Sequence, residues 1–246
     1  MTTLPRIIWM YWAQGWDSAP ELSQRARRAW TLHNPDWDVR AIDATDIERL
    51  LGPDWMRTPL PDKISLNVAA DLLRMALLDR FGGVWADATT FPVQPLDTWI
   101  DQHSITGFFA FDKPGPGRPL SNWFLAAMPA NELMRKWQDR SWDYWYQRDE
   151  MDDYHWHHNE FAKLLETDQK AADRYAEIDT ISAAHVLHFG PKNPTFDLPV
   201  SDTVMAAVAN RIAPVCKLTH KHPLGPEGTT MNWLSTVLSS RSDDPV

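Results

Sequence analysis

The chain contains 246 residues, 43% of them hydrophobic and 23% charged, which predicts one globular domain over residues 1–246 with its own core. Lys and Arg number 24 against 33 Asp and Glu, and this acidic balance argues against a partner bound through a nucleic-acid phosphate backbone. We therefore expect no nucleic-acid partner, while a local cationic pocket stays compatible with this composition.

No stretch of the sequence approaches the roughly 18 consecutive apolar residues of a membrane span. The first residues, MTTLPRIIWMYWAQG, lack the cationic start and the small-residue cleavage site of a signal peptide. We therefore expect a cytoplasmic protein, whose association with the inner membrane surface, if any, is peripheral.

Two residue types in the composition carry structural information. The single cysteine, Cys216, stands among apolar neighbours in RIAPVCKL, which predicts a buried thiol on a strand. The 14 tryptophans provide large flat apolar faces, suited both to core packing and to stacking on sugars or nucleobases. We expect most of them in the core and a few in a binding site.

The first 52 residues alternate between strand and helix patterns. RIIWMYW predicts a buried strand, ELSQRARRAWTLH a helix that ends at Asn34-Pro35, WDVRAID a second strand, and DIERLLG a short helix. Such alternation is typical of an α/β fold with a mostly parallel sheet and helices on both faces. In these folds, ligands bind beyond the carboxyl ends of the strands.

The later elements follow from periodicity and from Gly and Pro positions. We predict a helix over residues 64–80, a strand at VWADATTF, another at ITGFFAFD, and an exposed flexible loop at DKPGPGRP. From Ser121, SNWFLAAMPANELMRKWQDRSWDYWYQRD predicts a helix interrupted near Pro129, and DYHWHHNEFAKLLE predicts another. APVCKLTH has the pattern of a late strand.

The helix predicted over residues 64–80 is apolar on most of its surface. At about 100° per residue, Lys63, Asn67, Asp71 and Arg74 fall in one narrow sector, and leucine, valine and methionine fill most of the remainder. A buried helix with a polar stripe requires partners for that stripe in the interior. Asp71 and Arg74 can pair with each other at i,i+3, or can bind a ligand.

The predicted strand VWADATTF contains a carboxylate in an apolar setting. A period of two residues places Trp85, Asp87, Thr89 and Phe91 on one face. A buried carboxylate requires compensation, which a divalent cation bridging to a diphosphate would supply. The alternative is structural, with Asp87 capping a turn and Thr89 serving as a β-former.

The segment AADLLRMALLDRFGGVWADATTF resembles the sugar-binding DxD-type glycosyltransferases, and most closely the bacterial capsular polysaccharide synthesis proteins. The resemblance covers most of the chain, because four further segments stand in the order found in these proteins, namely IIWMYWAQG, NPDW, SNWFLAA and the late KLT. It implies a GT-A type nucleotide-diphosphosugar fold with a Rossmann-like mixed sheet, a divalent cation (Mn or Mg), and retention of anomeric configuration.

The resemblance also assigns roles to individual residues. Asp71 and Arg74 match the pair that holds the donor sugar, and Asp87 matches the first Asp of the DxD element. Trp9 matches an aromatic residue that stacks on the uracil of UDP. Residues 1–112 are expected to form the nucleotide-sugar-binding half, and residues 113–246 the acceptor side.

The sequence departs from the family pattern at Thr89, which replaces the second Asp of DxD, and at Ala70, which replaces a small polar residue before Asp71. A threonine hydroxyl is a poor substitute for a carboxylate as a metal ligand. Asp87 and Thr89 would then need a third ligand from the C-terminal segment, for which we predict His220. Weak or absent metal dependence is the alternative.

The remaining histidines give an acceptor-side hypothesis. His155, His157 and His158 are expected either to line an acceptor groove or to form a solvated helix face. In folds of this type the C-terminal segment often covers the diphosphate, so His220 and His222 are candidates there.

The resemblance therefore implies transfer of a hexose from a nucleotide sugar, with UDP as the expected nucleotide, to a polysaccharide or lipid-linked glycan acceptor in capsule or surface polysaccharide synthesis. Asp87, with a cation and with His220 or Lys221, would take the phosphate charge, and Asn122 would line the sugar face under attack. The alternatives are a glycosidase, a non-catalytic sugar-binding or nucleotide-sugar-binding protein, and a transferase acting on protein.

Overall fold

The computed structural model describes residues 3–61 and 64–240, so Lys63 of the predicted polar stripe lies outside the described residues. The strands are β1 (Ile7–Tyr11), β2 (Asp38–Ile42), β3 (Gly83–Ala86), β4 (Thr90–Pro92), β5 (Phe108–Gly115), β6 (Arg118–Ala127) and β7 (Val215–Lys217). The α-helices are α1 (Glu21–His33), α2 (Asp46–Leu51), α3 (Leu66–Phe81), α4 (Ile100–His103), α5 (Glu132–Trp145), α6 (Trp156–Thr167), α7 (Gln169–Ala176), α8 (Asp202–Ala209) and α9 (Thr230–Leu238).

The main sheet has five strands in the order β2-β1-β3-β6-β5. β1 pairs in parallel with β2 and β3, whereas β6 runs antiparallel to both β3 and β5. The parallel half matches the alternation predicted from the first 52 residues, and the β5–β6 hairpin makes the sheet mixed. This arrangement confirms the predicted α/β class with a Rossmann-like mixed sheet.

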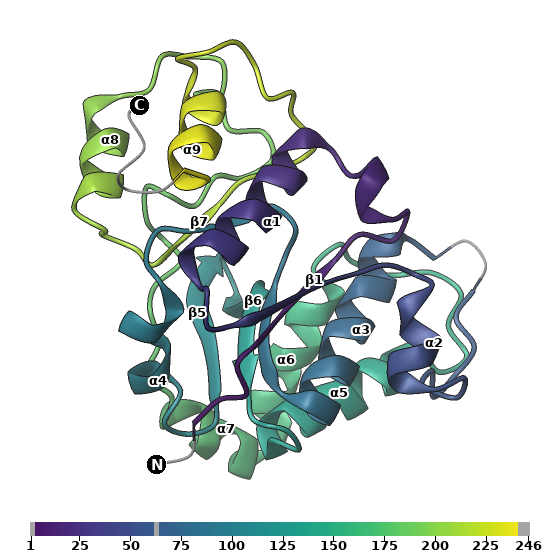
Figure 1. Cartoon of the computed structure of the whole chain (residues 1–246). Coiled ribbons are helices and arrows are strands. Elements are labelled where there is room, and N and C mark those ends of the chain that lie inside the picture. The colour runs from purple at the N-terminus through teal and green to yellow at the C-terminus, as the bar shows by residue number, and fades with distance from the viewer. Residues whose placement is uncertain (1–2, 62–63, 241–246) are drawn as a thin grey trace.

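Helices cover both faces of this sheet (Figure 1). Along β1, Ile8 and Met10 join one hydrophobic cluster with α1 and α9, and Trp9 joins the opposite cluster with α3 and α5. Alternate side chains of a strand point to opposite faces, so a strand between two helical layers is apolar throughout. The fully buried β1 residues Ile8, Trp9 and Met10 show this pattern.

The small second sheet joins distant parts of the chain. β7 pairs antiparallel with β4, with Thr90 opposite Lys217 and Phe91 opposite Cys216. Cys216 is completely buried, which confirms the predicted strand thiol, and burial raises the pKa of the thiol far above its usual value. The pairing places the residues that follow β7 beside the end of β3.

Three predicted elements differ in the structure. Residues 121–127 belong to strand β6 rather than to a helix, because β6 is central and buried on both faces, and periodicity alone does not separate such a strand from a buried helix. The predicted loop DKPGPGRP forms the end of the β5–β6 hairpin, whose turn contains Gly117 at φ 68°. The predicted division between residues 112 and 113 falls within β5.

The third predicted element that differs is the strand VWADATTF, which is interrupted in the structure. β3 ends at Ala86, and the carbonyl of Asp87 accepts the backbone N–H of Thr90 at 2.9 Å and its hydroxyl at 2.7 Å. A turn over residues 87–89 therefore separates β3 from β4 (Thr90–Pro92). Asp87 thus stands just beyond the carboxyl end of β3, where open α/β sheets bind ligands.

Two glycines connect α3 to β3. Gly82 and Gly83 have φ values of 66° and 94°, and a Cβ added at Gly83 would lie 2.5 Å from the carbonyl oxygen of Ile7. Only glycine accepts both the positive φ and this approach to β1. The pair lets the chain reverse directly from α3 into β3.

Among the residues described, no helix combines the length and the apolarity required to cross a bilayer.

Candidate active site

A cleft of about 300 Å³ opens beyond the carboxyl ends of β1 and β3. Its lining comes from the end of β1, from α3, from the turn after β3, from the first part of β6, from α6 and the residues before it, from residues 188–191, and from the end of β7 and the segment after it. The β4–β7 pairing brings this last segment to the cleft from more than 120 residues away in the chain.

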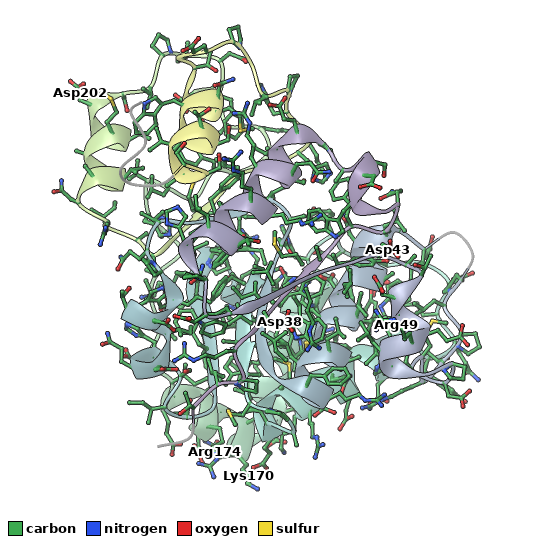
Figure 2. All side chains as sticks on the ribbon, viewed as in Figure 1. Asp38, Asp43, Arg49, Lys170, Arg174 and Asp202 are labelled. Atoms are coloured by element: carbon green, nitrogen blue, oxygen red, sulfur yellow. The ribbon has the colours of Figure 1, made fainter. Side chains whose placement is uncertain are left out.

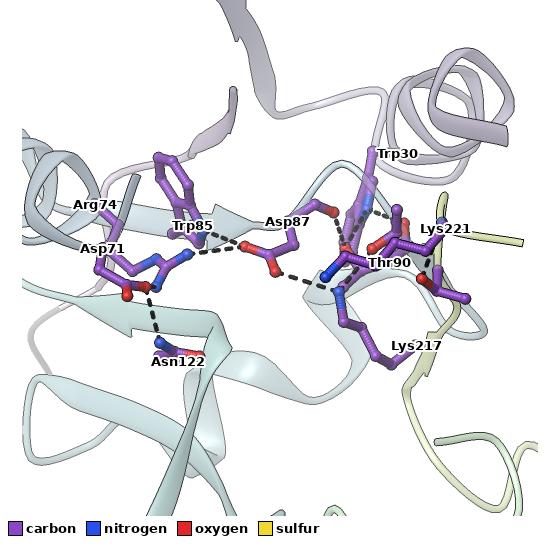
Figure 3. Close-up of polar contacts among 11 residues, drawn as sticks. Trp30, Asp71, Arg74, Trp85, Asp87, Thr90, Asn122, Lys217 and Lys221 are labelled. Atoms are coloured by element: carbon purple, nitrogen blue, oxygen red, sulfur yellow. Dashed lines mark hydrogen bonds and ion pairs between the residues drawn. The ribbon is translucent and has the colours of Figure 1, made fainter. Parts of the chain in front are cut away.

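Four charged side chains of alternating sign run along the cleft, namely Asp71, Arg74, Asp87 and Lys217 (Figure 3). We call these four residues the charge row. Arg74 pairs with Asp71 on the same helix, and its Nη2 lies 3.2 Å from Asp87 Oδ1. Lys217 Nζ lies 3.2 Å from Asp87 Oδ2. Each interior member of the row therefore contacts an opposite charge on both sides.

Arg74 is the most buried member of the charge row, with 4% of its surface exposed. Its guanidinium lies 5.1 Å from the ring centroid of Trp85, a cation–π distance. The Trp85 indole N–H also donates to Asp87 Oδ1 at 2.9 Å. Arg74 thus satisfies the alternative predicted from α3, pairing with Asp71, and it contacts Asp87 at the same time.

Asp71 is held on its other side by β6 and α6. Asn122 Nδ2 donates to Asp71 Oδ1 at 2.9 Å and lies 3.2 Å from Nδ1 of His157. His157 is buried, and its ring stacks on Trp137 at a centroid distance of 4.2 Å. Burial lowers the pKa of His157 well below its usual value, so it is neutral at pH 7.

The two carboxylates of the charge row have opposite pKa shifts. Burial raises the pKa of Asp71 to about 6, and this effect outweighs the opposing one of Arg74. Burial also acts on Asp87, but Lys217 and Arg74 overcome it, and the pKa of Asp87 is lowered. Asp87 is therefore fully ionised at pH 7, and Asp71 carries its charge at a cost in stability.

We predict from this shift that Asp71→Asn leaves the fold at least as stable as the wild type at pH 7. Because the folded pKa lies above the usual 3.8, the stabilising contribution of Asp71 is complete below pH 3.8 and is lost as pH rises through about 6. An amide, which imitates the protonated acid, should raise the free energy of unfolding at pH 7 by up to about 3 kcal/mol. Urea unfolding at pH 4.5 and pH 7 measures this difference.

Asp79→Asn is the matched control for this prediction, because Asp79 lies on the same helix and pairs with Arg135 at 2.6 Å outside the cleft. That change should lower stability slightly at both pH values. A loss of stability in Asp71→Asn that is larger at pH 7 than at pH 4.5 would contradict the assignment.

The predicted metal ligands are arranged around Lys217. Its Nζ lies 2.6 Å from Thr89 Oγ1 as well as 3.2 Å from Asp87 Oδ2. Asp87 Oδ1 already accepts from Trp85 and Arg74. Within residues 3–61 and 64–240, no group of three or more His, Cys, Asp and Glu side chains is arranged to hold a metal ion. In this arrangement these residues do not fit Mn or Mg, because an ammonium group occupies the position between the two oxygens.

The predicted C-terminal residues divide into two groups. His220 and Lys221 line the cleft, and the His220 ring meets the edge of Trp12 at a centroid distance of 5.2 Å. Burial lowers the pKa of His220, with Lys217 and Lys221 adding to the effect. His222 does not line the cleft and lies instead 3.2 Å from Asp197.

Trp9 lies in the core rather than in the cleft. Its side chain is completely buried between β1 and α3, and its indole N–H donates to the carbonyl of Gly82 at 3.0 Å. It therefore presents no ring face to a nucleobase in this structure, contrary to its predicted role. Tyr11 and Trp12, at the carboxyl end of β1, line the cleft instead.

The histidines of α6 do not form a solvated face. His158 is buried and lines the cleft together with His155, which stands just before the helix. Lys217 was not among the predicted site residues. The period-two argument that identified Asp87 would also have found it, since Lys217 is the one charged residue of the apolar strand pattern APVCKLTH.

In this cleft one arginine and one lysine alternate with two carboxylates. Such an arrangement at this edge of a sheet is typical of sites that bind phosphate and sugar groups together. The mixed sheet and this cleft define the chain as an α/β domain with a ligand-binding site at the carboxyl edge of its sheet. A model of the capsular polysaccharide synthesis proteins matches residues 2–232, and the chain belongs to that family. The match confirms the family predicted from the sequence.

Curated proteins that are similar to this chain are named glycosyltransferases, the enzyme class that the sequence predicts. The chain is 26% identical to the O-glycosyltransferase PaGT of Phomopsis amygdali over 174 residues, or 63% of this chain and 43% of that protein. It is 26% identical over 125 residues to the initiation-specific alpha-1,6-mannosyltransferase of Saccharomyces cerevisiae, covering 46% and 26% of the two chains. The chain spans less than half the length of these relatives.

Among solved structures, the PaToxG glycosyltransferase superposes with a TM-score of 0.48 and 17% sequence identity. The superposition covers 70% of this chain and 74% of that one.

Proposed function

We propose that this chain transfers a hexose from a nucleotide sugar, with UDP as the expected nucleotide, to a polysaccharide or lipid-linked glycan, with retention of anomeric configuration. The charge row carries the proposal, because it places two cations and two carboxylates side by side in a cleft at the carboxyl edge of the sheet. A diphosphate requires the cations, and sugar hydroxyls are bound by carboxylates and amides.

The members of the charge row have different tasks in this proposal. Asp71 and Asn122, joined by a 2.9 Å hydrogen bond, would accept and donate hydrogen bonds to the donor sugar, oriented by Arg74. Arg74 and Lys217 would face the leaving diphosphate, on which negative charge grows as the bond to the anomeric carbon breaks. An acceptor hydroxyl would attack from the same face, so no enzyme nucleophile is required.

The nucleobase would lie against the end of β1. Tyr11 and Trp12 line the cleft there, and Trp12 has an aromatic ring of the size that stacks on a base. The Trp12 ring is held at its edge by His220, from the segment after β7. We therefore assign to Trp12 the base-binding role that the sequence predicted for Trp9.

The acceptor would enter past α6. His155, His158 and Tyr154 line the cleft, and the ring centroid of Tyr154 lies 5.7 Å from the Nζ of Lys221. In this proposal residues 113–246 contribute to both sides, with His155 and His158 toward the acceptor and Asn122 and Lys217 toward the donor. Capsule or another surface polysaccharide, built at the inner membrane face, is the acceptor class that the family suggests.

A donor screen tests the proposed function. We expect one of UDP-glucose, UDP-galactose and GDP-mannose to raise the thermal midpoint of the protein by several degrees at millimolar concentration, because a ligand that binds only the folded state stabilises it. GDP-mannose is included because of the mannosyltransferase relative. The same donor should slowly release its nucleotide diphosphate, as measured by chromatography.

The screen also separates two alternatives, a binding protein and a glycosidase, from a transferase. A binding protein without catalytic activity would show the midpoint shift without release of the nucleotide. A glycosidase would show neither, and would instead cleave an aryl glycoside. Absence of a shift with every nucleotide sugar, with and without Mn²⁺, would overturn the proposed function.

A further inference from the structure

Lys217 is held in place from both sides of its strand. Its backbone N–H donates to the carbonyl of Leu187 at 2.9 Å, and its carbonyl accepts from Phe189 at 2.9 Å. Next to it, the N–H of Leu218 donates to the carbonyl of Thr89 at 2.9 Å. This last bond fixes the spacing between the lysine and the turn that carries Asp87 and Thr89.

The side chain of Lys217 is 17% exposed and reaches into the cleft. An ammonium group has three N–H donors and no acceptor. Two of them are directed to Asp87 Oδ2 at 3.2 Å and to Thr89 Oγ1 at 2.6 Å. One N–H donor of the ammonium remains for a ligand in the cleft.

We propose that the Lys217 ammonium takes the place of the divalent cation, so that this protein binds the diphosphate of its donor, and uses the donor, without a metal. The inference rests on the proposed function. Its basis is the position of the charge, which lies between the two side chains that a DxD element would offer to a metal.

Thr89 and Lys217 complement each other in this role. A second carboxylate at residue 89 would strengthen a divalent site, because Mg²⁺ and Mn²⁺ prefer several carboxylate oxygens. With a neutral threonine hydroxyl at residue 89, the site has only one carboxylate, that of Asp87. The hydroxyl oxygen can instead accept a hydrogen bond from an ammonium group. A divalent cation placed between Asp87 and Thr89 would also stand against the positive charge of Lys217 and that of Arg74, 3.2 Å from Asp87 Oδ1.

The charge balance of the cleft agrees with a diphosphate as the ligand. Arg74, Lys217 and Lys221 bring three positive charges, against two negative charges on Asp71 and Asp87. The cleft therefore carries one positive charge more than its carboxylates neutralise, before any metal is added. That excess attracts the negative diphosphate of a nucleotide sugar.

The transfer step balances without a metal. The bond between the anomeric carbon and the diphosphate oxygen breaks, and its electron pair leaves with that oxygen. The oxygen is then stabilised by hydrogen bonds from Lys217 and Arg74, which keep their protons. The acceptor oxygen bonds to the anomeric carbon, and its proton passes to the departing diphosphate on the same face.

The test has two measurements, the binding of UDP and GDP by isothermal titration calorimetry and the turnover of the donor. Both are made in about 5 mM EDTA and in about 5 mM MnCl₂. We expect Kd and turnover to agree within about threefold between the two conditions. Binding or turnover that falls more than tenfold in EDTA and returns with Mn²⁺ would overturn the inference and leave the proposed function standing. Failure of both nucleotides in both buffers would overturn the proposed function and the inference with it.

Substitutions make the test specific to Lys217. Lys217→Met should weaken nucleotide binding in EDTA more than tenfold, and Lys217→Arg should recover most of it. The double variant Thr89→Asp with Lys217→Met should bind nucleotide in Mn²⁺ and not in EDTA, because it has two carboxylates and no ammonium. Nucleotide binding by Lys217→Met equal to that of the wild type in EDTA would overturn the inference.

The matched control is Lys170→Met, which removes the same charge from α7, where Lys170 pairs with Glu132 at 2.6 Å. Figure 2 shows Lys170 beside Arg174 at the lower edge of the molecule. This variant should bind nucleotide as the wild type does. The thermal midpoints of all variants show whether each one is folded. A gain of Mn²⁺-dependent binding in the double variant would show that its binding site is intact.

Discussion

Asp87→Asn is expected to reduce donor turnover at least about 100-fold, the effect typical of removing one preorganised electrostatic contact in an active site. Asp87 is the one member of the charge row that contacts both Arg74 and Lys217. An asparagine has one carbonyl oxygen, so it accepts from one of these cations and turns its NH₂ toward the other. The two groups that face the leaving diphosphate would therefore lose their fixed positions.

The same substitution should leave the protein folded but less stable. The pKa of Asp87 is lowered in the folded protein, so its stabilising contribution is present at pH 7 and is lost as pH falls through the folded pKa. We expect the free energy of unfolding at pH 7 to fall by about 1–3 kcal/mol, which is the cost of losing hydrogen bonds to a charged group. Nucleotide release by chromatography and urea unfolding measure the two effects.

Asp79→Asn is again the control, because it removes a carboxylate paired with an arginine outside the cleft. Its turnover should agree with that of the wild type within about twofold. Turnover by Asp87→Asn near the wild-type rate would show that Asp87 is not part of the donor site.

Of the substitutions proposed here, Arg74→Ala should lower the free energy of unfolding the most. Arg74 is 4% exposed, and it separates Asp71 from Asp87 at the centre of the charge row. Without it, two largely buried carboxylates face each other without their shared cation, and a cavity opens beside Trp85. Breaking a buried ion pair in this way costs about 3–5 kcal/mol. For a chain of this size, the thermal midpoint should fall by roughly 6–20 °C.

Two further measurements identify the cause of this loss. The difference between Arg74→Ala and the wild type should shrink as pH is lowered from 7 to 5, because protonation of Asp71 removes one of the facing charges. Arg74→Lys should recover only part of the stability, because an ammonium is a single point charge and does not span both carboxylates as a guanidinium does. If the free energy of unfolding of Arg74→Ala lay within about 1 kcal/mol of the wild-type value, the central role of Arg74 would be contradicted.

Local sequence patterns predicted the elements that are amphipathic or clearly bounded. The strand–helix alternation up to α2 follows from apolar runs separated by Pro and Gly, and the structure confirms it. The polar stripe of α3 was visible because Asp71 and Arg74 interrupt an otherwise apolar helix. β6 was predicted as a helix because it is apolar on both faces, and such a run has no period that separates the two structures.

Contacts between distant segments were not visible in local patterns. Lys217 and Asp87 are 130 residues apart, and only the pairing of β7 with β4 brings them together. Trp9 and Trp12 are close in sequence and both aromatic, yet one lies under the sheet and the other lines the cleft. The strand ends between these two residues, and a residue beyond the strand no longer follows its two-sided alternation.

The sequence by itself determined the α/β class, the family, and the presence of a carboxylate and cation site on α3 and after β3. Those properties depend on local periodicity and on short motifs, which the order of residues contains directly. The tertiary structure decided what surrounds Asp87, and it placed an ammonium group where the motif alone suggested a metal. The physical reason is that a buried charge takes its partner from whichever segment packs against it, and that segment is chosen by the pairing of strands far apart in the chain.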